Sequence, residues 1–201
     1  KLLDEADELR KLRAQADQRT AALIPSLFFE MFGDPERNSR KWSTKAVADV
    51  CDLVRGSSPR PRSDPRYYGG PIPRLMIEDI TRDGWSVTPC VDSLTELGAT
   101  MSRPVKAGTI VMAVSGNIGL CAQLAVDACV HDGFVAFKDL RADFFVPLFF
   151  GMAMGQMRQS HQRNQAGAIF KNITTTDVKP MKITVPPMSL RGCRGCPFAC
   201  R

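Results

Sequence analysis

Apolar side chains near the start of the chain recur with the spacing of a helix that pairs with another helix. Within residues 1–32 an apolar residue returns every seven positions, and the positions between carry Asp, Glu, Lys, Arg and Gln. A stripe this narrow predicts a coiled-coil-like helix with a partner helix, although a helix packed on its own domain would show the same pattern. The expected interface residues are Leu2, Leu9, Leu12, Ala16 and Leu23.

Residues that interrupt helices mark the far end of this pattern. Pro25 predicts a kink or a new helical start, because proline lacks the backbone N–H that a helix interior uses. Gly33 and Pro35 form the glycine-then-proline sequence that follows many helices. We therefore assign residues 1–34 to a spacer or dimerisation helix and residues 35–190 to the domain that follows it.

From Trp42 onward the apolar residues gather in short runs that are typical of strands. Longer apolar periodicity predicts one helix, Phe144–Met157, and Thr174–Thr176 could cap a last short one. Short strands and a few helices without regular alternation predict an α+β domain with a mixed, mostly antiparallel twisted sheet. The expected strands are Ile72–Ile77, Thr109–Val114, Gln123–Val126, Gly133–Phe137 and Met181–Val185, and Lys45–Val54 is a helix or a strand.

The segment Gly56–Gly70 is rich in Gly, Ser, Pro and Arg, which predicts an exposed loop. Its arginines stand beside Tyr67 and Tyr68. An arginine fork fits guanine edges and phosphates, so a loop of this composition could enter the major groove of DNA. The tyrosines could equally anchor the loop to the core, and we expect them to divide between the two roles.

Charge is unevenly distributed along the 201 residues, although the net charge is only +6. Two basic stretches, 36–74 and 151–182, flank the acidic stretch 75–150. A fold that brought the basic stretches together would form a basic face, whereas scattered surface charge is the simpler alternative. No apolar run reaches the roughly 20 residues that span a bilayer, and the charged start does not resemble a signal peptide.

The residue types that carry catalysis are sparse. The two histidines, His131 and His161, lack companions at metal-ligand spacing, and no glycine-rich phosphate loop is present. Seven cysteines, an odd number, argue against a disulfide framework and favour a reducing cytoplasm. Cys193, Cys196 and Cys200 lack a fourth ligand nearby. We therefore expect a non-enzymatic protein without a metal or a cofactor.

Several segments, taken in order, resemble the specificity subunits of type I restriction–modification systems. Each is short, but together they run from about Leu2 to Leu190. The segments are Leu23–Pro35 (LIPSLFFEMFGDP), Gly56–Pro59 (GSSP), Tyr67–Pro73 (YYGGPIP), Asp79-Ile80, Val105–Gly119 (VKAGTIVMAVSGNIG), Gly133-Phe134, Gly167–Ile173 (GAIFKNI) and Ile183–Pro187 (ITVPP).

This resemblance implies one target-recognition domain that reads half of a split site in double-stranded DNA. It implies helices that set the spacing between two such domains, methyltransferase and restriction subunits as partners, and a place in the cytoplasm of a bacterium or archaeon. Phosphates would be bound by basic residues and bases by a few loop side chains, with Asn117 suited to adenine and the arginines to guanine. The expected DNA contacts are Ser57, Arg60, Arg62, Tyr67, Tyr68, Arg74, Ser115, Asn117, Lys171 and Asn172.

The sequence also departs from the family's pattern. Arg74 stands where relatives usually have tryptophan, Ser115 replaces a frequent arginine, and His131-Asp132 replaces the usual Asn-Gln. After Leu190 the resemblance stops at RGCRGCPFACR. We expect residues 191–201 to be an atypical tail, disordered or foreign to the native protein, and we expect the chain, which begins with Lys1, to be part of a longer one.

Two other classes of function fit parts of the same sequence. The chain could be the recognition region of a fused methyltransferase or nuclease whose catalytic part lies elsewhere. It could also be a protein-assembly module in which the helix carries the function and the basic residues are incidental. A half-subunit with an exposed helical stripe could in addition pair with itself.

Overall fold

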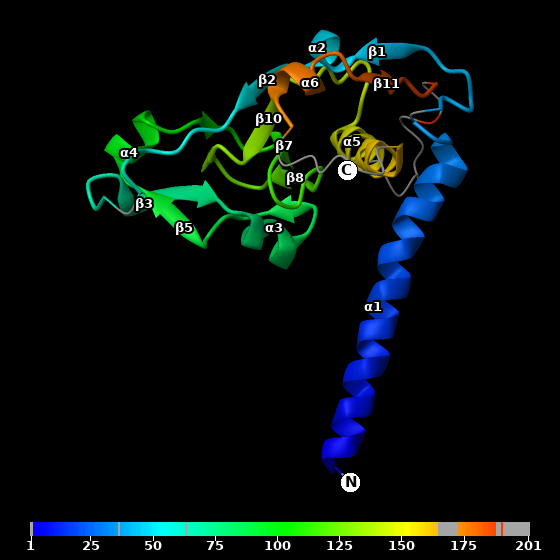
Figure 1. The fold of residues 1–201 in the computed structure, drawn as a ribbon, viewed down its shortest axis with the longest axis horizontal. Coiled ribbons are helices and arrows are strands. Elements are labelled where there is room, and N and C mark those ends of the chain that lie inside the picture. The colour runs from blue at the N-terminus through cyan, green and yellow to red at the C-terminus, as the bar shows by residue number, and fades with distance from the viewer. Residues whose placement is uncertain (1, 36, 63, 165–172, 188–189, 191–201) are drawn as a thin grey trace.

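A long helix stands beside a domain of short strands in the computed structural model, which describes residues 2–35, 37–62, 64–164, 173–187 and 190 (Figure 1). Helix α1 (Leu2–Phe32) is continuous and Pro25 lies inside it, so of the two expected alternatives, a kink or a new helical start, the new start is wrong. Gly33 ends it, with a φ of 74° that suits glycine and an N–H that donates to the Phe29 carbonyl at 2.8 Å. The predicted tail 191–201 lies outside the described residues.

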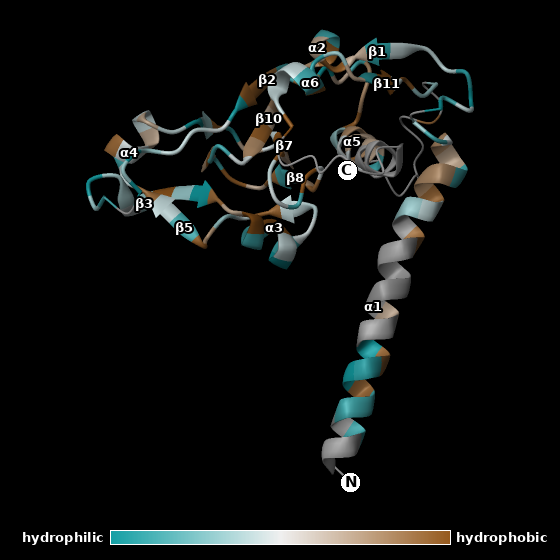
Figure 2. Cartoon of the chain, in the orientation of Figure 1, coloured by the Kyte–Doolittle hydropathy of each residue, from teal (hydrophilic) through white to brown (hydrophobic). Residues whose placement is uncertain are grey.

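Only the last turns of α1 pack on the domain. Phe28 and Phe32 are buried there, and both rings contact Phe149, with ring centroids 5.4 and 4.7 Å away. Figure 2 shows the hydrophobic turns of α1 at this junction. By contrast, Leu9 and Leu23 in the predicted stripe remain 67% and 58% exposed. The first two thirds of the helix therefore project from the domain with apolar residues open to contact.

Three sheets make up the rest of the domain. The five-stranded sheet is antiparallel except for one parallel pair, and its order is β2 (Asp52–Arg55), β10 (Phe134–Lys138), β7 (Ile110–Ala113), β8 (Cys121–Leu124) and β4 (Ser86–Val87). The four-stranded sheet also holds one parallel pair, and its order is β5 (Asp92–Leu94), β3 (Tyr68–Leu75), β9 (Ala128–Val130) and β6 (Pro104–Val105).

The third sheet joins the two ends of the domain. Strand β1 (Thr44–Ala46) pairs antiparallel with β11 (Lys182–Thr184), and the Val185 N–H donates to the Ser43 carbonyl at 2.8 Å. The predicted α+β class with mixed, mostly antiparallel sheets is confirmed.

Helices cover the sheets where apolar residues need burial. The longest helix after α1 is α5 (Pro147–Asn164), which buries Phe149, Phe150 and Met154 in a core shared with β7 and β10. Thr174 caps α6 as predicted, because its hydroxyl accepts from the Asp177 N–H. The short helices are α2 (Val47–Val50), α3 (Ile77–Asp83), α4 (Glu96–Thr100) and α6 (Thr175–Val178). In the described residues no helix is long and apolar enough to cross a membrane.

A buried carboxylate holds α3 to the strands that follow it. Asp79 is fully buried and accepts hydrogen bonds from the backbone N–H groups of Met76 (2.9 Å), Cys90 (2.9 Å) and Val91 (3.1 Å). The Arg82 guanidinium lies 3.3 Å from the same carboxylate. A buried charge needs such partners, so this network explains why an aspartate stands at this point of the Asp79-Ile80 segment.

Candidate nucleic-acid interface

The loop between β2 and β3 (residues 56–67, the β2–β3 loop) is fastened to the domain near its start. The Gly56 N–H donates to the Phe134 carbonyl at 2.9 Å, and the Ser57 N–H donates to the Val130 carbonyl at 3.0 Å. The Tyr68 hydroxyl donates to the Pro59 carbonyl at 2.9 Å. Sequence patterns predicted an open loop through Gly70, but β3 already begins at Tyr68 and Gly56 is buried.

Residues that flank helix α4 hold both ends of the β2–β3 loop. At the far end, the Thr95 hydroxyl donates to the Arg66 carbonyl at 2.6 Å and the Thr95 N–H to the Tyr67 carbonyl at 2.9 Å. At the near end, the Ser102 hydroxyl donates to the Ser57 carbonyl at 2.7 Å. Both ends of the loop backbone are therefore held against the segment 95–102, which includes α4.

Asp132 fixes the same loop from the other side. Its carboxylate accepts from the Ser58 hydroxyl at 2.8 Å and lies 3.2 Å from the Arg60 guanidinium, while its carbonyl accepts from Arg55 Nε at 3.0 Å. Partial burial raises the pKa of Asp132, but hydrogen bonding to Ser58 and the charge of Arg60 help to outweigh it, and the pKa is lowered overall. Asp132 is therefore ionised at neutral pH and acts as a fixed anchor for two arginines.

His131 beside it is a neutral, partly buried side chain. Its Nδ1 accepts a hydrogen bond from the Gly133 N–H at 2.9 Å, and its ring meets Phe134 edge-on. Burial and the charge of Arg74 lower the pKa of His131, although Asp132 acts in the opposite direction. The His131-Asp132 pair is therefore part of the loop's support.

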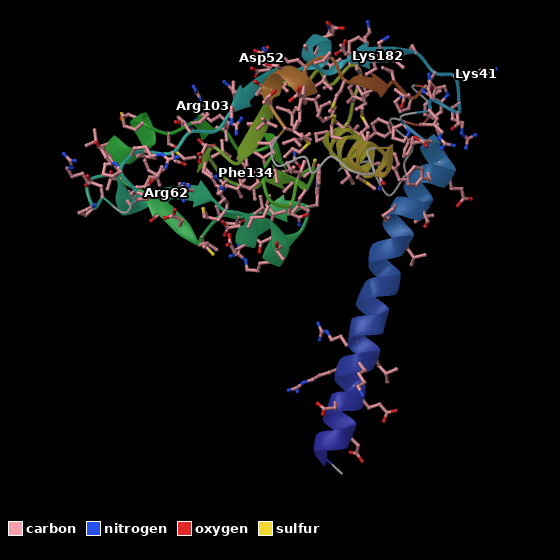
Figure 3. The ribbon with its side chains drawn as sticks, in the orientation of Figure 1. Lys41, Asp52, Arg62, Arg103, Phe134 and Lys182 are labelled. Atoms are coloured by element: carbon pink, nitrogen blue, oxygen red, sulfur yellow. The ribbon has the colours of Figure 1, made fainter. Side chains whose placement is uncertain are left out.

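Five arginines lie exposed on and beside the β2–β3 loop: Arg55, Arg60, Arg62, Arg66 and Arg103. Figure 3 labels two of them, Arg62 and Arg103, at the end of the domain away from α1. Carboxylates pair with only two of the five within the described residues: Asp132 with Arg60 and Asp64 with Arg66, the latter at 2.7 Å. This end of the domain, which we call the arginine face, therefore carries a local excess of positive charge suited to a polyanion.

Some predicted contact residues support the arginine face from inside. Arg74 is 7% exposed, pairs with Asp92 at 2.6 Å and lies under the Tyr68 ring, with its guanidinium carbon 5.3 Å from the ring centroid. Its Nε has no hydrogen-bond partner among the described residues. Ser57 and Tyr68 are likewise committed to internal hydrogen bonds, whereas Tyr67 is half-buried beside the Arg66 guanidinium. Tyr68 thus has the anchoring role expected for one of the tyrosines, and DNA contact by Tyr67 stays a prediction.

Two further predicted residues, Ser115 and Asn117, belong to a neighbouring turn. Ser115 is half-buried next to Gly133, where a Cβ would lie 2.9 Å from the Ser115 hydroxyl, and Asn117 is exposed. Because Gly133 directly follows Asp132, this turn borders the segment that anchors the β2–β3 loop. Lys171 and Asn172 lie outside the described residues.

Sequence reasoning missed Arg103 and Asp132 as parts of this surface. Arg103 precedes β6, and its Nε donates to the Arg55 carbonyl at 3.3 Å. No local sequence pattern predicts this contact, because Arg55 and Arg103 come together only through the pairing of β6 with β9. In the part of the chain that the structure describes, no group of three His, Cys, Asp or Glu side chains could hold a metal ion.

Comparison with solved structures identifies the fold. An HsdS subunit from Thermoanaerobacter tengcongensis matches 94% of this chain with a TM-score of 0.61 and 22% sequence identity. A chain from a structure of the type I R-M system, solved to explain complex assembly and conformational transition, matches 94% with a TM-score of 0.64 and 21% identity. The chain spans 44% and 45% of the length of these two proteins. No protein-family profile matches the sequence.

Proposed function

We propose that this chain is a target-recognition domain that binds a specific DNA sequence within a type I restriction–modification system. The observation that carries the proposal is the shared fold, which matches two such structures over 94% of the chain. The sequence segments that occur in the family's order resemble the same family, and this support does not depend on the fold. In this proposal the chain is not itself catalytic and directs partner subunits to a half-site in the cytoplasm of a bacterium or archaeon.

The arginine face supplies the chemistry that DNA binding requires. Guanidinium groups that bind phosphates give affinity that falls as salt rises, and a few that reach base edges give specificity. Arg62 is the best candidate for base contact, since it is exposed between the two ends of a loop that α4 fixes. Arg55 and Arg60 are held by Asp132 and are better placed for the phosphate backbone. Asn117 and Tyr67 lie on the border of this face and remain proposed contacts.

Partner subunits would meet the chain along α1. Leu9, Leu12 and Leu23 are 67%, 55% and 58% exposed, and Ala16 is exposed as well. An apolar stripe in water favours a second helix, either from the same subunit, from a methyltransferase subunit or from another copy of this chain. Recruitment of a restriction subunit would follow from the assembled complex.

Selection from random duplexes tests the proposal. The chain, with and without its methyltransferase subunit, is incubated with a pool of random duplexes at low and moderate salt, and the retained DNA is sequenced. Enrichment of a short half-site that weakens with salt supports a recognition domain. Absence of enrichment even with the partner subunit would instead favour an assembly module, the alternative supported by the exposed stripe of α1.

A further inference from the structure

Helix α4 places two apolar side chains in water at the arginine face. Leu97 and Met101 are 54% and 53% exposed, whereas Gly98 and Ala99 between them are buried. Residues four apart share one side of a helix, so Leu97 and Met101 form a single small apolar patch. Figure 2 shows hydrophobic positions of α4 at the end of the domain that also carries the hydrophilic β2–β3 loop.

The β2–β3 loop brings its cations to this patch. The Met101 carbonyl accepts from the Ser57 hydroxyl at 3.2 Å, and Thr95 binds the Arg66 carbonyl, so the loop leaves one end of α4 and returns to the other. Arg103 follows Met101 by two residues. The apolar patch is therefore flanked by the segments that carry Arg62, Arg66 and Arg103.

A DNA duplex with a thymine facing Leu97 and Met101 fits both the apolar patch and the arginines that flank it. The thymine C5-methyl is the apolar group that a base edge offers in the major groove, and phosphates line the groove on both sides. Glu96 is exposed next to Leu97. A carboxylate is repelled by phosphates but accepts a hydrogen bond from cytosine N4, so Glu96 favours the base edges over the backbone for this side of α4.

We propose that Leu97 of α4 and Met101, its C-cap residue, contact thymine C5-methyl groups in the DNA half-site and thereby help to specify its sequence. This inference rests on the proposed function and adds the class of base contact. Removing a buried methyl group costs about 0.8 kcal/mol, which corresponds to about a fourfold loss of affinity.

Thymine-to-uracil exchange tests the contact, because it removes the C5-methyl and leaves base pairing intact. The selected half-site is prepared with each thymine replaced in turn by uracil, and dissociation constants are measured for the wild type, for the double variant Leu97→Asn, Met101→Gln, and for Val91→Asn. Val91 is a matched control, since it is 52% exposed next to β5, outside the arginine face. Thermal melting of all three proteins verifies that they are folded.

We expect at least one uracil to weaken the wild type and Val91→Asn about fourfold and to leave the double variant unaffected. Equal sensitivity in the double variant, or no sensitivity in the wild type, overturns the contact while leaving DNA recognition intact. A selected half-site without thymine has the same consequence. If no half-site is enriched at all, the proposed function fails and the contact fails with it. If the double variant instead loses a methyltransferase subunit while keeping the uracil penalty, the patch is a protein interface and the inference is wrong.

Discussion

Gly98→Ala offers a direct test of the claim that α4 positions the β2–β3 loop. A Cβ on Gly98 would meet the Tyr67 carbonyl group, 2.8 Å from its carbon and 3.0 Å from the Tyr67 Cα. Ordinary contact begins at 3.4 Å and the Tyr67 carbonyl oxygen is closer still, so the two backbones must separate by more than 0.6 Å, the difference between 3.4 and 2.8. That separation would stretch the Thr95–Tyr67 hydrogen bond from 2.9 Å to beyond about 3.5 Å, the limit of a useful bond.

The free energy of unfolding should therefore fall by about 1–3 kcal/mol, the usual cost of overpacking, even though alanine is the better helix former by about 1 kcal/mol. Urea denaturation measures this change. Gly155→Ala in α5 is the matched control, because its Cβ would meet only the Gly119 carbonyl at 3.5 Å, and we expect it to be neutral or stabilising. DNA affinity should fall for Gly98→Ala alone. If Gly98→Ala is as stable as Gly155→Ala and binds DNA normally, α4 does not position the loop.

Four further predictions follow from the same structure. Arg62→Ala should lose about 1–3 kcal/mol of binding free energy if it reads a base, and an unchanged affinity and salt slope in filter binding would exclude it. The pKa of His131 in the folded protein lies below its ordinary value of 6.5, so the unfolded chain binds a proton at this residue more readily. The contribution of His131 to the free energy of unfolding should therefore be fully present above pH 6.5 and fall as the pH drops below it. Urea titrations at several pH values should show a smaller fall for His131→Asn, and an identical pH profile would contradict this. Leu9→Glu with Leu23→Glu should abolish helix-mediated assembly in analytical ultracentrifugation without altering the melting temperature of the domain; intact assembly would rule out the stripe. Asp79→Asn should cost about 1–3 kcal/mol for each backbone N–H left without an acceptor, so a near-wild-type urea midpoint would refute its anchoring role.

Elements with strong local signals were predictable from the sequence. A few neighbouring residues are enough to predict these elements: the heptad pattern of α1, the Thr174 cap, and the alternating or continuous apolar runs of β7 and β10. The strands β4 and β6 have two residues each and exist only because a distant partner pairs with them. Helix α3 begins at Ile77 after Met76, which is not a typical N-cap residue, because the Asp79 carboxylate accepts from the Met76 N–H.

The arginine face was predictable only in part, since burial depends on contacts between distant residues. The run of arginines after β2 indicated a basic surface, and its exposed members lie together on the arginine face. Arg74 looked equivalent in sequence, because arginine is rarely buried. The antiparallel register that sets Arg74 opposite Asp92 supplies the buried partner, and nothing near Arg74 in the sequence announces it. The role of Asp132 depends in the same way on a loop 72 residues away.

The seam between β1 and β11 has a consequence for how such a domain can be exchanged. Because residues 44–46 pair with residues 182–184, the chain enters and leaves the domain at one place. A chimera that kept the paired strands β1 and β11 could replace all residues between them. The ends of the inserted segment would then stay in register with the rest of the chain. The exchanged segment would also have to fit α1, because it contains Phe149, the residue on which Phe28 and Phe32 of α1 pack. An aromatic residue at that position is thus the compatibility condition for a chimera that changes what is recognised without disturbing the helix that carries it.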